Sequence, residues 1–299
     1  MKTFSPLAIR SVLEQAARRL RQISDTPELD AQVVLAKLLG KSRSWLAAHL
    51  DSHLDSQTLA SLESALQRLE AGEPLPYVLG SWEFYRLVFE VTPDVLIPRP
   101  ETELLVERAI AWLRQRLERL EKNKEHLVSR FSLRVLDVGT GSGCIAIALA
   151  VNLPQITVVA TDISAPALAV AQRNAERFKV ADRITFLEAD LAPEYLEMSP
   201  FDLIVANLPY IPTQRLHQLP IYGREPTLAL DGGEDGLTLI RRLLQRSPRL
   251  LSPGGRMILE IDASQGLAAL SIAYDVFEQA EIHLYQDLAG HDRLLEIQR

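Results

Sequence analysis

The chain has 299 residues, enough for about two domains, and its 47% hydrophobic and 24% charged residues are ordinary for a globular protein that buries a sizeable core. With 32 basic and 39 acidic side chains the net charge is −7, which disfavours duplex nucleic acid as the main partner. The single cysteine, Cys144, excludes an internal disulfide and a four-cysteine zinc site.

No metal site, membrane span or secretion signal is predicted. The six histidines lack the spacing of metal ligands. No apolar run approaches the ~20 residues that span a bilayer. The N-terminal segment has no long apolar stretch followed by a small-residue cleavage site. We therefore expect a cytoplasmic protein.

Residues 1–73 are predicted to form a small bundle of four helices. Leucine, isoleucine, valine and alanine recur with helical period throughout this part of the chain. Turn and capping residues mark the expected helix ends, namely Ser5, Pro6, Thr26, Pro27, Gly40, Asp55, Ser56 and Gly72. These helices could bury their apolar faces against one another.

Residues 74–98 are predicted to be a β-hairpin linker. Pro74 and Pro76 cannot continue the preceding helix, and aromatic and β-branched residues dominate 81–93. A further helix is expected from Pro100, where proline suits the first helical position. It runs into the mixed charges of 114–130, which are predicted to be an exposed extension.

In residues 99–299, β-rich segments alternate with helical ones. Strands are predicted at 133–139, 157–163, 183–190, 201–209 and 256–262, with a turn at 252–255 before the fifth. Two last strands, at 280–286 and 292–298, are too close for a helical crossover and predict an antiparallel hairpin. The fold class is therefore α/β, a doubly wound and mainly parallel seven-stranded sheet, with a helical bundle before it.

A glycine-rich loop joins the first predicted strand of this part to its helix. It reads Gly139, Thr140, Gly141, Ser142 and Gly143, and glycine lets the backbone turn sharply beside a ligand. The spacing differs from that of a dinucleotide-binding loop, and the lysine of a phosphate-binding loop is absent. Taken alone, such a loop is weak evidence for any one ligand.

Acidic residues end the next two predicted strands. Asp162 lies where such folds place a carboxylate that binds both hydroxyls of a ribose, although it could instead cap the following helix. Asp190 and Leu191 end the third strand, in positions that would flank an adenine ring. Together with the glycine loop, these strand ends predict an adenosine-containing ligand along one edge of the sheet.

The fourth predicted strand ends in Asn207, Leu208, Pro209 and Tyr210. A planar amino group is a poor nucleophile because its lone pair is delocalised. The Asn207 side-chain oxygen and the Leu208 carbonyl could accept its two N–H bonds and orient the nitrogen for attack. Tyr210 offers a face on which a planar group can stack. Outside this context, the tetrapeptide would be an ordinary turn.

These motifs resemble those of class I S-adenosylmethionine-dependent methyltransferases that act on amino nitrogens. The segments IPRPETE, LDVGTGSGCIAIALA, EPTLALDGGEDGL and DLAGHDR, with the helical N-terminus, resemble the protein-(glutamine-N5) methyltransferases of the HemK/PrmC type. The resemblance covers nearly the whole chain. It implies methylation of the glutamine in the Gly-Gly-Gln motif of class I peptide chain release factors, with S-adenosylhomocysteine as the other product.

The resemblance also implies roles for individual residues. Residues 139–143, Asp162 and Leu191 would bind S-adenosylmethionine, and residues 207–210 would hold the glutamine, with Asn207 also at the cofactor. The N-terminal bundle would dock the release factor on a methyltransferase domain of residues 99–299. A monomer without direct nucleic-acid binding is expected.

Three departures from the family pattern stand out. Leu208 replaces the second residue of the family's usual Asn-Pro-Pro-Tyr, which keeps the backbone carbonyl but loses a rigid proline. Asp262 stands where the family commonly has glycine, and the segment 114–130 is lengthened. Three other functions stay open: a nucleic-acid N6-adenine methyltransferase, a glutamine methyltransferase of a ribosomal protein, and a non-catalytic cofactor-binding module.

Overall fold

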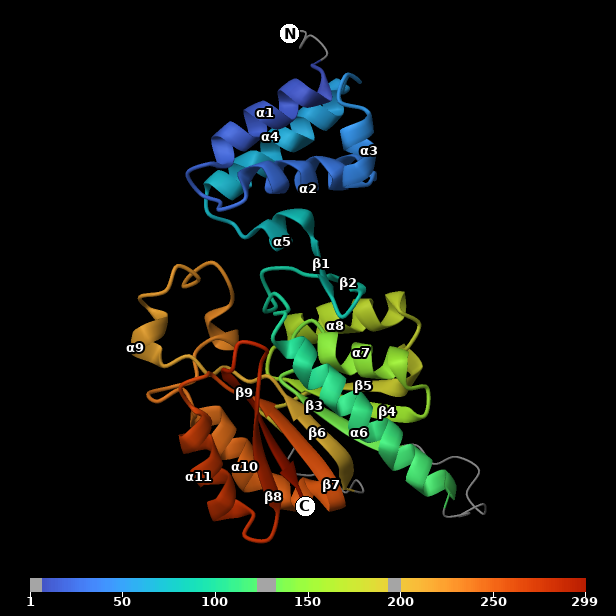
Figure 1. Ribbon diagram of the computed structural model, residues 1–299, viewed down its shortest axis with the longest axis vertical. Helices are drawn as coiled ribbons and strands as arrows, with labels where there is room; N and C mark the ends of the chain where they lie inside the picture. Colours follow the sequence, from blue (N-terminus) through green and yellow to red (C-terminus); the bar gives the residue numbers. More distant parts are fainter. Residues whose placement is uncertain (1–6, 123–132, 193–199) are drawn as a thin grey trace. The chain divides into compact units, whose positions relative to one another are not determined.

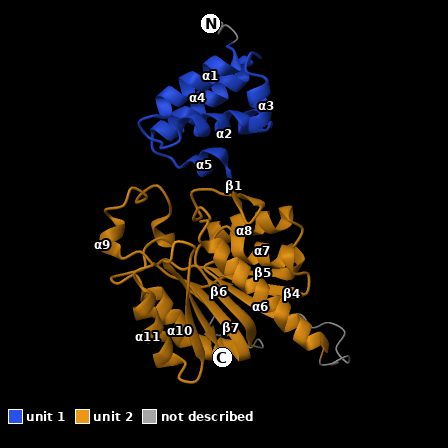
Figure 2. Cartoon of the chain, viewed as in Figure 1, with its two compact units in different colours: residues 1–81 blue, residues 82–299 orange. Residues whose placement is uncertain are grey.

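A computed structural model describes residues 7–122, 133–192 and 200–299 (Figure 1). The chain divides into two units, residues 1–81 and 82–299 (Figure 2). The first unit thus contains the expected bundle and the start of the expected linker, and the second contains the rest. The functional boundaries at residues 73 and 98 stay predictions.

The first unit is helical, as the periodicity indicates. Its helices are α1 (Ile9–Leu20), α2 (Pro27–Leu39), α3 (Arg43–Ala48), α4 (Ser56–Glu70) and α5 (Leu75–Leu79). Pro27 begins α2, Gly40 ends it in the left-handed conformation, and the Asp55 side chain accepts the Thr58 N–H at the start of α4. Ser5 and Pro6 lie outside the described residues.

The short helix α5 was not anticipated from the sequence. The helix α4 ends before them, at Glu70, and Pro74 and Pro76 occupy the N-cap and the first turn of α5, where a missing N–H leaves no helical hydrogen bond unmade. The apolar faces of the helices meet in one core, which includes Ile9, Leu20, Leu35, Leu46 and Leu66.

The expected hairpin consists of β1 (Ser81–Phe84) and β2 (Leu87–Glu90). Tyr85 and Arg86 form its turn with φ of 49° and 62°, the left-handed values that a tight two-residue hairpin turn needs. Phe84 and Phe89 are buried, and Phe89 packs on Phe178 with ring centroids 5.2 Å apart.

The second unit contains the expected α/β sheet. Its strands are β3 (Leu133–Val138), β4 (Ile156–Asp162), β5 (Ile184–Glu188), β6 (Phe201–Ala206), β7 (Leu251–Glu260), β8 (Glu281–Gln286) and β9 (Asp292–Gln298). They lie in the order β5-β4-β3-β6-β7-β9-β8. The first five are parallel, and β9 runs antiparallel to both β7 and β8. The predicted fold class is therefore confirmed.

Helices cover both faces of this sheet (Figure 1). The helices of this unit are α6 (Thr102–Lys122), α7 (Cys144–Asn152), α8 (Ala165–Arg177), α9 (Thr213–Leu216), α10 (Thr238–Leu250) and α11 (Gly266–Val276), with the 3-10 turns η1 (Ala181–Arg183) and η2 (Thr227–Ala229). None of the described helices is long and apolar enough to cross a membrane.

Several sequence expectations about element ends were wrong, among them the following. The turn expected at 252–255 is instead part of β7, which begins at Leu251 beside Phe201 and shifts register before Arg256. The helix expected from Pro100 begins at Thr102. Of the charged segment 114–130, residues to Lys122 belong to α6 and the remainder lies outside the described residues.

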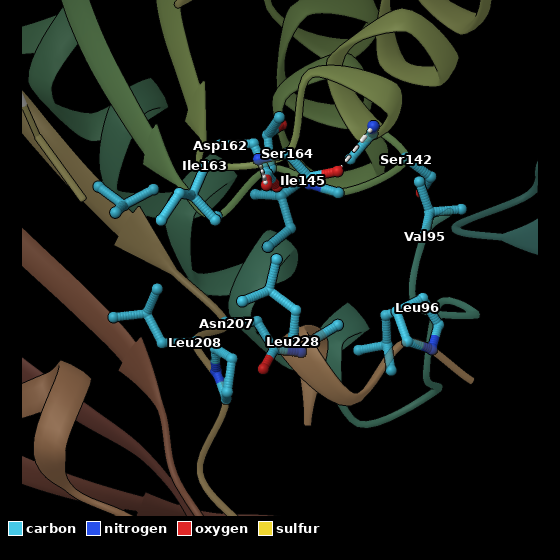
Figure 3. Close-up of a pocket in the computed structure, with 18 of the residues that line it drawn as sticks. Val95, Leu96, Ser142, Ile145, Asp162, Ile163, Ser164, Asn207, Leu208 and Leu228 are labelled. Carbon is cyan, nitrogen blue, oxygen red and sulfur yellow. Dashed lines mark hydrogen bonds between the residues drawn. The ribbon is translucent and has the colours of Figure 1, made fainter. Parts of the chain in front are cut away.

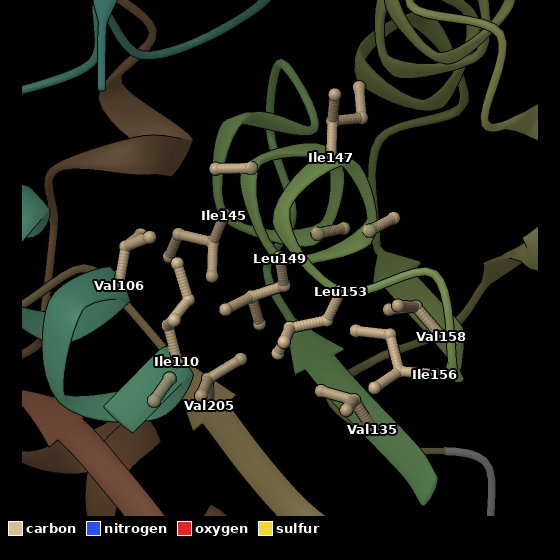
Figure 4. Close-up of a cluster of buried hydrophobic side chains, with 14 of the residues drawn as sticks. Val106, Ile110, Val135, Ile145, Ile147, Leu149, Leu153, Ile156, Val158 and Val205 are labelled. Atoms are coloured by element: carbon tan, nitrogen blue, oxygen red, sulfur yellow. The ribbon is translucent and has the colours of Figure 1, made fainter. Parts of the chain in front are cut away.

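The two faces of the sheet bury separate hydrophobic cores. One core joins α6, α7 and the hairpin to the sheet, where Val135, Ile145 and Leu149 are buried (Figure 4). The other joins α10 and α11 to the opposite face through Leu136, Leu243 and their neighbours. Because the central strands are buried on both faces, their loops at the carboxyl edge are held rigidly, and that edge carries the predicted site.

Candidate active site

The glycine loop lies between β3 and α7. Gly139, Gly141 and Gly143 have φ of 72°, 54° and 80°, which a residue with a Cβ adopts only with strain. The N–H groups of Gly139 and Thr140 both donate to the Thr161 carbonyl on β4, which anchors the loop to the neighbouring strand.

Gly143 has a packing role at the start of α7. A Cβ on this residue would lie 2.9 Å from the Ile147 side chain and 3.3 Å from the Ala171 Cα. The glycine therefore lets α8 approach the loop closely. It does not line the cavity described below, whereas the other four residues of the loop do.

Asp137 on β3 supports the loop from beneath. It is fully buried, and one carboxylate oxygen accepts the Thr140 hydroxyl at 2.7 Å and the Ala146 N–H at 3.2 Å. Burial raises the pKa of Asp137 to about 7. Its other oxygen has no hydrogen-bond partner within the described ranges. No role for Asp137 was predicted from the sequence, although an acid inside a buried strand is itself a signal of function.

Asp162 lies at the end of β4, facing the glycine loop. Its two oxygens accept the N–H groups of Gly141 and Ser164, each at 2.9 Å. Ser164, and not Asp162, caps α8 by accepting the Ala167 N–H. Burial raises the pKa of Asp162. Each oxygen keeps a further lone pair, which can accept a hydroxyl of a ligand.

Leu191 follows β5, which ends earlier than expected, at Glu188. The residue has a φ of 67° and is 6% exposed, so its side chain is turned into the protein beside the cavity. Neighbouring Asp190 forms an ion pair with Arg242 of α10 at 2.6 Å. Asp190 is therefore part of an ion pair as well as a turn.

Asn207 directly follows β6. Its side-chain nitrogen donates to the Thr102 hydroxyl oxygen at 2.9 Å, so its side-chain oxygen is left for another donor. Leu208 is 4% exposed, and its side chain packs on Gly139, where a Cβ would lie 3.1 Å away. The leucine that departs from the family pattern thus fills the space over a glycine.

Tyr210 makes hydrogen bonds through both its side-chain hydroxyl and its backbone carbonyl. Its hydroxyl donates to Glu260 Oε1 at 3.3 Å, and its backbone carbonyl accepts the Gln265 side-chain nitrogen at 2.9 Å. Burial and the nearby Glu260 carboxyl raise the pKa of the Tyr210 hydroxyl, which therefore stays protonated. Asp262, the other departure, accepts the Ser264 N–H and pairs with Arg215 of α9 at 3.3 Å.

A cavity of about 280 Å³ brings most of these residues together (Figure 3). Of the predicted site residues it is lined by Gly139, Thr140, Gly141, Ser142, Asp162, Leu191, Asn207, Leu208 and Pro209. Leu228 and Ile163 add apolar surface to it. Its walls combine carboxylates, among them the half-buried Asp162, and polar backbone with apolar side chains, as expected for a nucleoside.

A second cavity, of about 180 Å³, adjoins the same tetrapeptide. Residues 207–209 line both cavities, and Tyr210 lines only the second. The tetrapeptide therefore borders both cavities.

The segment before α6 and the residue before η2, Pro226, also line the first cavity. Neither was among the site residues predicted from the sequence. Arg99 pairs with Glu225 at 2.6 Å, and Glu225 also accepts the Ile97 N–H at 3.0 Å. These residues lie in the motifs IPRPETE and EPTLALDGG, and those motifs were the sequence signal that could have assigned them to the site. Within the described ranges, no cluster of three metal-ligating side chains occurs.

Comparisons with known proteins place the chain in a family. Residues 11–80 match the PrmC N-terminal domain, and residues 119–219 match the methyltransferase small domain. A release factor glutamine methyltransferase of Moorella thermoacetica is 42% identical over 290 residues, covering 96% of this chain and 97% of that protein. One of Rhodopirellula baltica is 37% identical, covering 99% of this chain and 97% of that protein.

A solved structure supports the fold assignment. The hMettl16 catalytic domain in complex with the MAT2A 3'UTR hairpin 6 has a TM-score of 0.52 and 16% identity, over 82% of each chain. At that identity, the likeness extends to the fold alone. The near full-length matches above decide the family, and the chain belongs to the release factor glutamine methyltransferases.

Proposed function

We propose that this protein transfers a methyl group from S-adenosylmethionine to the side-chain amide nitrogen of the glutamine in the Gly-Gly-Gln motif of class I release factors. Family membership supports the substrate. The observation that supports the chemistry is Asn207, whose side-chain nitrogen is bound to Thr102 and whose oxygen is free to accept an amide hydrogen between two cavities.

The first cavity fits the methyl donor. Asp162 would accept the ribose hydroxyls with the lone pairs that Gly141 and Ser164 leave free. Ile163, Leu191 and Leu208 would provide apolar surface for the adenine, and the bare backbone of the glycine loop would approach the amino-acid part closely. The donor, when bound, supplies an electrophilic methyl carbon on a sulfonium.

The protein's contribution to transfer is alignment. The Asn207 side-chain oxygen and the Leu208 carbonyl would accept the two N–H bonds of the substrate amide, which favours the pyramidal nitrogen needed for attack. The nitrogen forms the new bond to the methyl carbon as the carbon–sulfur bond breaks. The amide proton becomes acidic only after transfer, so water can remove it and no strong base is needed.

The test is direct labelling. The protein is incubated with tritiated S-adenosylmethionine and a purified release factor, and the labelled residue is mapped by mass spectrometry. We expect one labelled residue, the glutamine of Gly-Gly-Gln, and no label when that glutamine is changed to asparagine. Label on another residue, or none, would contradict the proposal.

The same assay separates the other functions. A glutamine methyltransferase of ribosomal proteins would label ribosomal subunits instead, and an adenine methyltransferase would label duplex DNA or RNA. A cofactor-binding module would bind the donor and label nothing. The predicted cytoplasmic location and monomeric state stay predictions, which fractionation and light scattering would test.

A further inference from the structure

Glu260 is a buried acid with no part in the mechanism proposed above. It ends β7, is 1% exposed and lines neither cavity. Its Oε1 accepts the Tyr210 hydroxyl, while Oε2 has no hydrogen-bond partner among the residues that the structure describes. A buried carboxyl group is costly unless its charge is compensated, so its place directly behind the tetrapeptide calls for a function.

Thr102 connects this acid to Asn207. It is the first residue of α6, is 2% exposed, and its oxygen accepts the Asn207 side-chain N–H. The Thr102 hydroxyl also lowers the pKa of Glu260, which places it near that carboxyl group, and within the described residues no hydrogen bond joins the two.

A hydroxyl has one hydrogen, and its direction decides how the asparagine amide is oriented. If that hydrogen points to the Glu260 carboxylate, the oxygen of Thr102 presents only lone pairs to Asn207 and must receive its NH₂ group. The Asn207 oxygen then faces away from Thr102. If instead the hydrogen points to Asn207, the amide is favoured in the flipped orientation, with its NH₂ group toward the substrate.

We propose that Glu260 and Thr102 are positioning residues that fix the orientation of the Asn207 carboxamide, so that its oxygen accepts the N–H of the substrate amide. This inference rests on the proposed function. The carboxylate draws the threonine hydrogen toward itself, the threonine oxygen binds the asparagine NH₂ group, and Tyr210 is held by the same carboxylate. A flipped Asn207 amide would turn its NH₂ group, a donor, toward the N–H donor of the substrate amide. The substrate nitrogen would then lose its alignment.

The charge state of Glu260 follows from its surroundings. Burial raises the pKa of Glu260 to about 7, while the Thr102 and Tyr210 hydroxyls oppose that rise. Other charged and titratable groups also interact with Glu260. Glu101 raises the pKa of Glu260 and Arg293 lowers it, while the charge of Glu260 raises the pKa of the Cys144 thiol. A protonated Glu260 no longer attracts the threonine hydrogen, so kcat should fall as the pH falls through about 7.

The first experiment compares Thr102→Val with Thr102→Ser. Valine keeps the shape of threonine and removes the hydroxyl, while serine keeps the hydroxyl. With saturating donor and a purified release factor, we expect Thr102→Val to lower kcat at least about tenfold, and Thr102→Ser to stay within about threefold of wild type. The dissociation constant for S-adenosylmethionine, measured by calorimetry, should be unchanged in both, because the hydroxyl does not hold the donor.

The second experiment is the pH profile of Glu260→Gln, which removes the charge and keeps the shape. The wild-type kcat should rise between about pH 6 and pH 8, and Glu260→Gln should be slower and show no such rise. The donor must be saturating because the pKa of Asp137, beneath the glycine loop, is also raised to about 7. Protonation of Asp137 would change the affinity for the donor, and a saturating donor concentration removes that effect from kcat.

The outcomes separate this inference from the proposed function. If the wild-type protein does not label the release factor, the proposed function fails and this inference fails with it. If the wild type labels the factor and Thr102→Val has the wild-type kcat, only the inference fails. It also fails if Thr102→Ser is as slow as Thr102→Val, or if Glu260→Gln keeps the wild-type rise with pH.

Discussion

Asp162 and Asn207 each make hydrogen bonds within the protein and also line the first cavity. Asp162 accepts two backbone N–H groups, and Asn207 donates to Thr102. These partners fix the direction of the acceptor lone pairs that remain on each side chain, which lowers the entropy lost when a ligand binds. Substituting either residue should therefore remove a ligand contact without a large change in the sheet beneath.

Replacing Asp162 by alanine should weaken donor binding. The variant loses the oxygens that would accept the ribose hydroxyls, so the dissociation constant for S-adenosylmethionine should rise at least about tenfold, as measured by calorimetry. The matched control is Asp182→Ala at an exposed position in η1, which should bind the donor as the wild type does. Unchanged affinity in Asp162→Ala would refute the ribose role.

Replacing Asn207 by alanine should act on turnover instead. Loss of the acceptor should lower kcat about 100-fold with the release factor, while the donor dissociation constant stays within about twofold of wild type. Asn152→Ala is the control, because among the described residues that side chain bonds only to the Ala148 carbonyl of its own helix. A wild-type rate in Asn207→Ala would contradict the mechanism.

Among the elements, α8 connects the hairpin to the glycine loop through one side chain. Asn174 is fully buried; its oxygen accepts the Glu90 N–H at 2.8 Å, and its nitrogen donates to the carbonyls of Glu90 and Ser142 at 3.0 and 2.9 Å. The side chain thus satisfies three backbone groups from two separate segments. Its loss would leave polar groups buried without partners.

Asn174→Ala should destabilise the second unit. Each unpaired buried group costs about 1–3 kcal/mol, so the variant should lose about 3 kcal/mol of stability. The midpoint of thermal unfolding should fall by about 2–4 °C for each kcal/mol lost. Asn152→Ala again serves as the control and should shift the midpoint by no more than about a degree or two. An unchanged midpoint in Asn174→Ala would show that water replaces the side chain.

Element types followed from the sequence more readily than element ends. The strands of the central sheet are continuous apolar runs, and their burial on both faces makes that pattern hard to mistake. The early start of β7 was missed because Pro253, Gly254 and Gly255 are typical of turns. Pairing of Leu251 with Phe201 on β6 overrides that local preference, and a sequence taken alone does not report such a partner.

For the molecule as a whole, the first unit is proposed to dock the release factor. Residues 82–299 contain every described residue of both cavities that face the tetrapeptide. The catalytic chemistry should therefore survive without the first unit, while recognition of a whole protein should not.

A chain that begins at Trp82 tests whether the first unit recognises the protein substrate while residues 82–299 carry out the chemistry. It should methylate a short peptide containing Gly-Gly-Gln at a rate within about threefold of the full chain, and the KM for the whole release factor should rise at least about tenfold. Calorimetry with S-adenosylmethionine checks that the shortened chain is folded. Equal loss on peptide and protein would assign the first unit a purely structural role.

The sequence by itself determined the fold class and most of the residues around the first cavity, because strand ends in a parallel sheet meet at one edge and the motifs mark those ends. Only the tertiary structure revealed that Gly143 packs behind the loop, that Leu208 covers Gly139, that Thr102 binds Asn207 and that Glu260 binds Tyr210. These contacts join residues up to 105 positions apart, from Thr102 to Asn207, and no local pattern encodes a contact between segments so distant in the chain.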